Sequence, residues 1–234
     1  MVSPVVEVDC IPPTHPSVLY EPSNPLSHDL DEILLTNQQI LARVDQLARD
    51  IGDDYKGRII QPVVVMDGAH LFYKDLVCRI NSSVGVLEPL LIKVKSYDGD
   101  YSTGRHEIRL HKDSKVDLGV VKGSDLLFIE DIIDTGMTID VLGGYLNDLG
   151  PGRVCGAVLL DKPSARKVEP RSDLVRYTGF RIPKKFVVGY GLDYRGQLRG
   201  EPHIGVLAPD GQRRIDLEVA KAPNTSYNRF SYRC

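Results

Sequence analysis

The stretch of sequence that decides the fold reads LLFIEDIIDTGMT and spans residues 126–138. Its first four residues are all apolar, which is typical of a strand that is buried on both faces of a parallel sheet. Apolar residues then recur at helical spacing over residues 141–149, and Gly150-Pro151 ends the helix. The sequence therefore predicts a loop between the carboxyl end of a parallel strand and the amino end of a helix.

A loop in this position is a natural seat for a phosphate group. The first backbone N–H groups of a helix have no partner within the helix, and the helix dipole favours an anion there. Thr135 and Thr138 can add hydroxyl donors, and Gly136 lets the backbone approach the anion closely. Glu130 and Asp131 would repel a phosphate, but they suit the two hydroxyls of a ribose or a Mg²⁺ ion that bridges them. The stretch predicts a ribose 5-phosphate pocket, and the simpler alternative is a strand-to-helix turn with acidic surface residues.

Composition excludes several classes of protein. The 234 residues are 42% hydrophobic, which is enough for one sizeable α/β domain or two small ones. The net charge of −3 provides no basic field for a nucleic acid, and the four cysteines contain no CxxC pair, which favours a reducing compartment. No apolar run approaches membrane-spanning length, and the first Lys or Arg is Arg43, so no signal peptide is predicted. We expect a cytoplasmic protein that binds neither nucleic acid nor membranes.

Predicted strands and helices alternate along the chain. We expect helices over residues 30–51, with a break near 36–37, and 71–80, and strands over 60–66, 90–94, 126–129, 154–160, 186–188 and 204–207. This alternation predicts an α/β fold with a mostly parallel twisted sheet flanked by helices, and ligands outside the carboxyl ends of the strands. Residues 1–27 hold six of the fifteen prolines and are expected to form an arm, 28–215 the main domain, and 216–234 a polar tail.

Three segments resemble one known family. Residues 130–136, EDIIDTG, resemble the phosphoribosyl-pyrophosphate signature of type I phosphoribosyltransferases, in the version found in the hypoxanthine-guanine phosphoribosyltransferases. LLDKP at 159–163 and KFVVGYGLDY at 185–194 resemble further segments of that family. The resemblance covers roughly residues 28–215. It implies the type I phosphoribosyltransferase fold with a small hood region, Mg²⁺ as cofactor, and a homodimer or homotetramer.

The resemblance also implies roles for residues that are ambiguous by themselves. Asp134 would be the base that accepts or steadies a purine proton, although an aspartate here also suits a helix N-cap. Lys162 would contact the purine 6-oxo group, although most lysines at strand ends lie on the surface. Phe186 would stack on the purine and Val187 would offer backbone groups, with Lys185 beside them. Residues 186–194 also suit an ordinary aromatic core strand followed by a turn that contains Asp193.

The remaining implied contacts are those with the sugar, its phosphates and the metal. The metal would be held by Asp193, Glu130 and Asp131. The implied nucleotide-binding residues are Asp67, Gly68, Ser96, Tyr97, Glu130, Asp131, Ile132, Ile133, Thr135, Gly136, Met137, Thr138 and Arg199. Residues 96–104 match the mobile lid of the family, although a polar hairpin loop would look the same.

Two positions depart from the family pattern. The family commonly has Leu-Lys-Gly-Gly after its first strand, where this chain has Met66-Asp67-Gly68-Ala69. In the family this loop gives backbone amides to pyrophosphate, often through a non-proline cis bond. The amides survive the change, but a carboxylate near pyrophosphate weakens its binding unless it points away or faces Mg²⁺. Met137 stands where a lysine is frequent, which removes one positive charge from the phosphate loop.

The resemblance implies transfer of 5-phosphoribose from phosphoribosyl pyrophosphate to a 6-oxopurine. Hypoxanthine and guanine would give IMP and GMP with release of pyrophosphate, and xanthine use is left open. A lysine donor favours a keto oxygen over an amino group, which predicts rejection of adenine. Two alternatives remain. One is a paralogue that binds nucleotide without turnover, which Asp67 supports; the other is a regulator with this fold, against which the acidic balance and the retained Asp134 and Lys162 argue.

Overall fold

The computed structural model describes residues 2–21, 26–96, 106–112, 114, 118–169, 171 and 173–221. The chain divides into two compact units. The first comprises Met1–Asp9 and Leu41–Lys184, and the second comprises Cys10–Ile40 and Lys185–Cys234.

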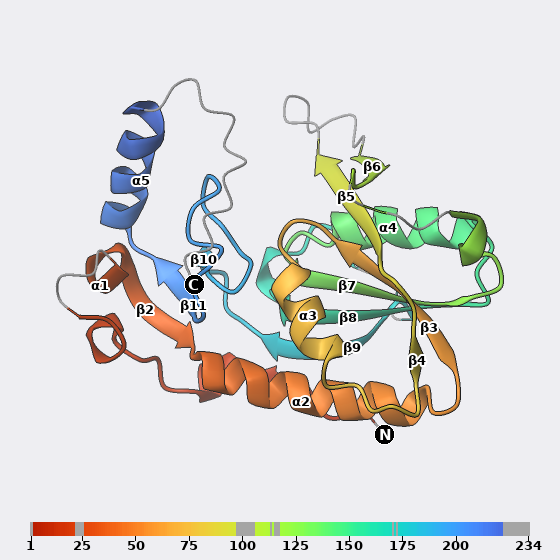
Figure 1. The fold of residues 1–234 in the computed structure, drawn as a ribbon. Coiled ribbons are helices and arrows are strands. Elements are labelled where there is room, and N and C mark those ends of the chain that lie inside the picture. Colours follow the sequence, from red (N-terminus) through yellow and green to blue (C-terminus); the bar gives the residue numbers. More distant parts are fainter. Residues whose placement is uncertain are drawn as a thin grey trace. The chain divides into compact units, whose positions relative to one another are not determined.

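The first unit is built on a mostly parallel sheet of eight strands with the order β1-β9-β8-β7-β3-β5-β6, and β4 pairs with β3 outside this path (Figure 1). Every pair of neighbours is parallel except β5 and β6. The strands are β1 Val6–Glu7, β3 Ile59–Val65, β4 Gly85–Val86, β5 Leu90–Ser96, β6 His106–Leu110, β7 Asp125–Ile133, β8 Arg153–Asp161 and β9 Val175–Arg181. The α/β class with a mostly parallel sheet is confirmed.

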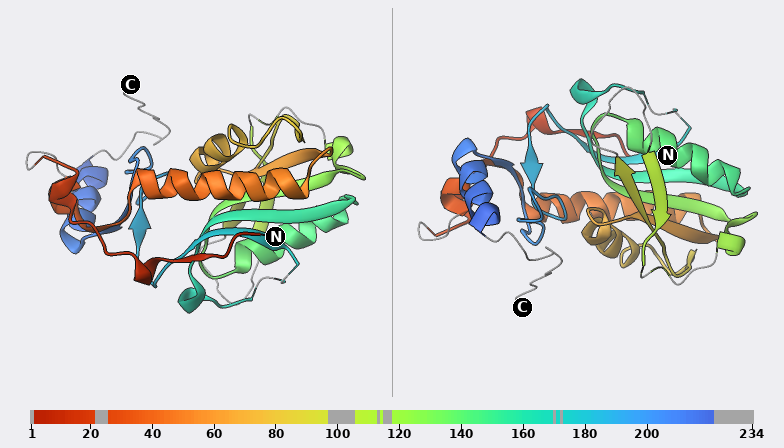
Figure 2. Two further views of the ribbon diagram at one scale, coloured as in Figure 1. Left: turned by 90° about the horizontal axis from the view of Figure 1, so that it is seen from below. Right: turned by 90° about the horizontal axis from the view of Figure 1, so that it is seen from above.

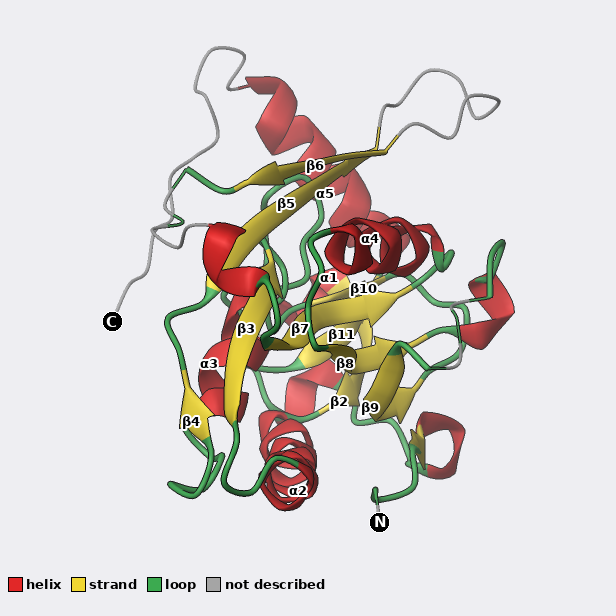
Figure 3. Cartoon of the chain, turned by 90° about the vertical axis from the view of Figure 1, so that its right-hand side faces the viewer, coloured by secondary structure: helices red, strands yellow, loops and turns green. Residues whose placement is uncertain are grey.

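Helices cover both faces of this sheet. α4 (Met137–Asp148) lies on one face, and α3 (His70–Val77) lies on the other together with residues 41–54 of α2 (Asn37–Asp54), as Figures 2 and 3 show. Short 3₁₀ helices occupy Val8–Cys10, Pro16–Val18, Leu118–Val121 and Pro163–Ala165. No helix in the described part of the chain combines the length and the apolar character needed to cross a membrane.

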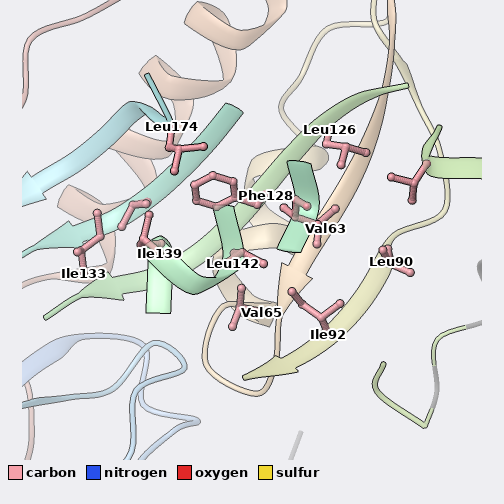
Figure 4. Packing of buried hydrophobic residues seen from close by; sticks show 13 residues of the cluster. Val63, Val65, Leu90, Ile92, Leu126, Phe128, Ile133, Ile139, Leu142 and Leu174 are labelled. Atoms are coloured by element: carbon pink, nitrogen blue, oxygen red, sulfur yellow. The ribbon is translucent and has the colours of Figure 1, made fainter. Parts of the chain in front are cut away.

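A hydrophobic core lies between α4 and the sheet. Ile139, Leu142 and Leu146 of α4 are buried against apolar residues of β3, β5, β7 and β8 (Figure 4). Among the contacts from the sheet are Val63 of β3 and Phe128 of β7, both without solvent exposure. Alternate strand residues such as Val64 and Leu127 are equally buried. Burial on both faces explains the continuous apolar runs in these strands.

The second unit contains a three-stranded antiparallel sheet with the order β10-β11-β2. Its elements are α1 Leu26–Asp29, β2 Leu30–Leu35, β10 Val187–Val188, β11 Ile204–Leu207 and α5 Pro209–Lys221. Leu30, Val188 and Ile215 lie in its core, and the Arg214 guanidinium donates to the buried Asp29 carboxylate, which joins α5 to α1. The resemblance implied a small hood region without assigning residues to it.

The predicted helix over 30–51 is wrong in its first part. Residues 30–35 form β2, because they pair with β11 about 170 positions later in the chain. Thr36 and Gln39 form a capping box: Thr36 N donates to Gln39 Oε1 at 2.7 Å, and Gln39 N donates to Thr36 Oγ1 at 3.3 Å. This cap explains why the helix begins only at Asn37.

Two other boundaries differ from the prediction, and some strands were not predicted. β7 continues to Ile133, because it pairs with β8 as far as Asp161, so Glu130 and Asp131 lie in the strand rather than in the loop. β6 and β9 had no predicted counterpart. The tail predicted from residue 216 begins inside α5, which extends to Lys221, and residues 222–234 lie outside the described part of the chain.

Candidate active site

The candidate site lies at a topological switch point of the sheet, where the connections from two neighbouring strands lead in opposite directions. The chain passes from β3 through α3 to β5 on one side, and from β7 through α4 to β8 on the other side, while β3 and β7 are neighbours. The loops after β3 and β7 therefore diverge, and such switch points leave a crevice at the carboxyl edge of an open sheet. Residues 66–69, 134–136 and 162 follow β3, β7 and β8 at this edge.

Glu130 and Asp131 form an acidic pair next to the loop after β3. Glu130 is 5% exposed, and its Oε1 accepts a hydrogen bond from Asp131 N at 3.0 Å. Burial, and then the charge of Asp131, raises the pKa of Glu130 well above its usual range. A Cβ atom at Gly68 would overlap the Asp131 carboxylate, so a larger residue there would require this side chain to shift. Hydroxyl donors or a cation would relieve the mutual repulsion of the two carboxylates.

The loop between β7 and α4, which is the predicted phosphate loop, contains a glycine that no other residue replaces without strain. Gly136 is the N-cap of α4 with φ +86°, and a Cβ atom there would overlap Val168 O. Thr135 O accepts from the backbone N–H groups of Lys167 and Val168 at 2.9 and 3.0 Å, which fixes the loop from its far side. The half-buried Thr138 lies in the first turn of α4. Met137 N lies 3.5 Å from Thr135 Oγ1, and the phosphate site at the start of α4 stays a prediction.

Asp134 and Lys162 are brought together by the neighbouring ends of β7 and β8. Lys162 Nζ lies 3.3 Å from Asp134 Oδ2, and the two side chains are 7% and 50% exposed. The backbone N–H of Lys162 donates to Ile133 O at 3.0 Å, which continues the β7–β8 pairing. The N-cap alternative for Asp134 is wrong, because the cap of α4 is Gly136 and has no side-chain hydrogen bond. The surface alternative for Lys162 is also wrong, because its side chain is buried.

Arg166 is a residue of this site that the sequence reasoning missed. Its Nη1 donates to Ile133 O and to Asp134 O, both at 2.9 Å, and its Nη2 forms an ion pair with Asp161. The side chain is 10% exposed. The available signal was an arginine three residues after the LLDKP segment, with an aspartate inside that segment. The two carbonyl contacts fix the backbone of Asp134.

The loop after β3 carries an ion pair instead of an isolated carboxylate. Lys93 Nζ of β5 lies 2.7 Å from Asp67 Oδ2, and His111 Nε2 lies 3.8 Å from Asp67 Oδ1. His70 Nδ1 is 3.0 Å from the backbone oxygen of Asp67. The Met66–Asp67 peptide bond is cis.

The predicted residues of the second unit form two groups. Lys185 Nζ lies 2.5 Å from Glu32 Oε1, and the next residue, Phe186, is 49% exposed with its ring edge-on to Tyr194 at 5.6 Å. Val187 is buried in β10. The core-strand alternative is therefore wrong for Phe186, which precedes the strand and leaves half of its surface accessible.

Asp193 and Arg199 are partners in the structure. Arg199 Nη2 lies 2.6 Å from Asp193 Oδ1, Arg199 Nη1 donates to Gly191 O at 2.6 Å, and Gly196 N donates to Asp193 Oδ2 at 2.5 Å. These contacts hold the arginine and the aspartate in one turn of the second unit.

For the remaining predicted site residues, the structure gives only their burial or their place in a strand, or does not describe them. Ile132 is half-buried, Ile133 is buried and Met137 is half-buried. Ser96 ends β5, whereas Tyr97 and the lid residues up to 104 lie outside the described residues. Within the described ranges there is no group of three or more His, Cys, Asp or Glu side chains placed to hold a metal ion.

Comparisons with known proteins agree on one family. The model of the phosphoribosyl transferase domain matches residues 31–195. The hypoxanthine-guanine phosphoribosyltransferase of Bacillus subtilis is 35% identical over 184 residues, covering 79% of this chain and 97% of that protein. A bifunctional TilS/HprT protein of Listeria monocytogenes is 38% identical over 190 residues, and the match spans 79% of this chain but only 27% of that longer protein. A hypoxanthine phosphoribosyltransferase structure from Staphylococcus aureus has a TM-score of 0.70 and 34% identity, covering 81% of this chain and 98% of that one.

Proposed function

The chain belongs to the phosphoribosyl transferase family, and from this membership we propose that it is a purine-salvage enzyme. It transfers 5-phosphoribose from phosphoribosyl pyrophosphate to hypoxanthine or guanine and forms IMP or GMP with pyrophosphate. The observation that carries the proposal is the pair of Asp134 and Lys162, which lies beside the phosphate loop at the switch point of the sheet. The non-catalytic alternative predicts nucleotide binding without turnover.

In the proposed reaction a purine ring nitrogen displaces pyrophosphate from C1 of the ribose. The transition state resembles an oxocarbenium ion, as in glycosidic chemistry. Asp134 is half exposed, so its carboxylate can reach the purine and accept or steady the proton of the attacking nitrogen. Lys162 donates to the 6-oxo group, and its burial strengthens this electrostatic interaction. Arg166 keeps the Asp134 backbone in place during the reaction.

Further contacts with the substrates are proposed for each unit by itself. In the first unit, Thr135, Gly136, Met137 and Thr138 bind the 5-phosphate through backbone amides and hydroxyls. In the second unit, the accessible ring of Phe186 stacks on the purine, while Val187 provides backbone groups. Lys185, which precedes Phe186 in the sequence, is paired with Glu32.

Mg²⁺ is the proposed cofactor. Adjacent carboxylates supply the hard oxygen donors that this ion prefers. Burial, and then the neighbouring charge of Asp131, raises the pKa of Glu130, and a bound cation would oppose this shift. Glu130 and Asp131 are the proposed metal ligands of the first unit, and Asp193, which is paired with Arg199, is the proposed metal ligand of the second unit. When bound, the ion neutralises charge on the departing pyrophosphate.

The proposed setting is a homodimer or homotetramer in the cytoplasm. This part of the proposal is supported by the family membership and by the composition of the chain. Light scattering after size-exclusion chromatography tests the assembly, and a monomer at assay concentration would contradict it.

The function is tested by an absorbance-monitored turnover assay with phosphoribosyl pyrophosphate and Mg²⁺. The assay is repeated with hypoxanthine, guanine, xanthine, adenine and uracil as the base. The expected result is turnover of hypoxanthine and guanine, with no turnover of adenine or uracil, and the same panel decides xanthine. Folded protein that binds GMP but turns over none of the bases would favour the non-catalytic alternative.

A further inference from the structure

Asp67 belongs to an ion pair that connects the loop after β3 to the neighbouring strand β5. The pairing of Val65 with Ile92 places Lys93 beside the end of β3, and the Lys93 ammonium lies 2.7 Å from Asp67 Oδ2. His111 Nε2 lies 3.8 Å from the other carboxylate oxygen, Oδ1. The three side chains are 24%, 39% and 16% exposed for Asp67, Lys93 and His111, so solvent screens the pair only in part.

The charge at this loop matters because of what lies next to it. Gly68 is in such close contact with Asp131 that a single Cβ atom would overlap the carboxylate. The loop therefore adds a third acidic group, Asp67, to the edge that already carries Glu130 and Asp131. A diphosphate that approaches the backbone amides of this loop meets the charge of Asp67 next to the Asp131 carboxylate that contacts Gly68, and an uncompensated carboxylate lowers its affinity.

We propose that Lys93 is a positioning residue for the pyrophosphate side of the reaction. It holds the Asp67 carboxylate in an ion pair and cancels its charge, so that the Asp67–Gly68 backbone can accept the diphosphate of phosphoribosyl pyrophosphate or free pyrophosphate. This inference rests on the proposed function. It predicts that Lys93 matters because Asp67 is present, and that removing the carboxylate makes the lysine dispensable.

The test is a double-mutant cycle with Lys93→Gln, Asp67→Asn and the double variant. Lys93→Gln is expected to raise KM for phosphoribosyl pyrophosphate about three- to tenfold, while kcat and KM for hypoxanthine change less than about twofold. Asp67→Asn is expected to lower the KM for the sugar substrate. The double variant should recover most of the affinity that Lys93→Gln loses, because no carboxylate is left to neutralise.

Lys74→Gln is the matched control, since Lys74 is 70% exposed on α3 and its ion pair with Asp75 is long, at 4.0 Å. An exposed or partly exposed ion pair contributes little to folding, so all four variants should keep the thermal unfolding curve of the parent. The same KM increase in Lys74→Gln would overturn the proposal, because the effect would then be that of any lost positive charge.

Two further results would also overturn it. An unchanged KM in Lys93→Gln would show that the Asp67 charge does not affect the diphosphate. An increased KM that persists in the double variant would make Lys93 a direct ligand instead of a positioning residue.

Calorimetric titration of the folded protein with pyrophosphate and Mg²⁺ separates this inference from the proposed function. Absence of turnover in the parent refutes the proposed function, while the titration still reports the affinity for pyrophosphate in all variants. The expected order of affinity is Asp67→Asn, then the parent, then Lys93→Gln, and the loss of this order overturns the inference.

Discussion

Replacement of Arg166 by methionine is expected to slow turnover and to destabilise the first unit. The guanidinium makes two hydrogen bonds of 2.9 Å to the carbonyl oxygens of Ile133 and Asp134, and an ion pair with Asp161. Hydrogen bonds of a charged donor contribute about 1.5–3 kcal/mol each. Because water replaces some of these hydrogen bonds in the variant, we expect the free energy of unfolding to fall by about 2–4 kcal/mol.

The effect on turnover follows from the position of Asp134. A shift of about 1 Å in a reacting group can cost on the order of a hundredfold in rate. Since Arg166 holds the Asp134 carbonyl but does not touch its carboxylate, we expect kcat to fall about 10- to 100-fold. The measurements are urea unfolding and steady-state kinetics with hypoxanthine, at a temperature where the variant is fully folded.

Arg181→Met is the matched control. Arg181 shares Asp161 as a partner, at 3.5 Å, and also pairs with Glu7 at 2.7 Å, but its side chain is 45% exposed and it contacts β1 rather than the Asp134 loop. Its replacement should cost less than about 1 kcal/mol, and kcat should remain within about threefold of the parent. Equal kcat in Arg166→Met and Arg181→Met would refute the positioning role of Arg166.

Three further predictions concern single residues. Lys162→Met should lower the preference for hypoxanthine over adenine, measured as the ratio of kcat/KM values, by about tenfold or more, and an unchanged ratio would remove Lys162 from base selection. Gly136→Ala should cost about 1–3 kcal/mol of stability, because φ of Gly136 is +86° and a backbone carbonyl fills the Cβ position. Its control is Gly144→Ala on α4, which has open space around the added Cβ atom and should stabilise the protein by about 0.5–1 kcal/mol. Equal shifts in melting temperature for the two variants would contradict this prediction. His203 accepts a hydrogen bond from Asn37 N at 2.9 Å, and burial lowers the pKa of His203 in the folded protein. Its contribution to stability is therefore complete above the unfolded pKa of about 6.5. This contribution is lost as pH falls from that value through the lower pKa of the folded state. Urea unfolding at pH 7.5 and 5.5 should show a smaller loss on acidification in His203→Gln than in the parent, and an equal loss would exclude His203 as a cause.

The sequence predicts best where structure is encoded locally. The strand, loop and helix around residues 126–149 are evident because the apolar run, the small loop residues and the helical spacing follow one another directly. Asp134 and Lys162, which directly follow β7 and β8, are singled out by the family resemblance, because each residue alone also suits an ordinary structural role. Their contact needed the parallel pairing of β7 with β8, which a sheet of this class makes expected.

The remaining features depend on partners that are distant in the sequence. Residues 30–35 have a pattern that suits a helix or a strand, and only β11 decides between them. Arg166 looks like any basic residue after a proline until the carbonyl groups of β7 lie beside it. The ion pair joins Asp67, in the loop after β3, to Lys93 of β5. The sequence alone therefore predicts an unfavourable carboxylate at position 67 and does not identify Lys93 as its counter-ion.

The role of Asp134 as the base is tested most sharply by steady-state turnover of Asp134→Asn with hypoxanthine, saturating phosphoribosyl pyrophosphate and Mg²⁺. Asparagine keeps the size of the side chain and removes its basicity. We expect kcat to fall about 10²- to 10⁴-fold, which is the usual contribution of a general base, while KM for phosphoribosyl pyrophosphate stays within about threefold. A kcat equal to that of the parent would contradict the assignment of the chemistry to the Asp134–Lys162 pair.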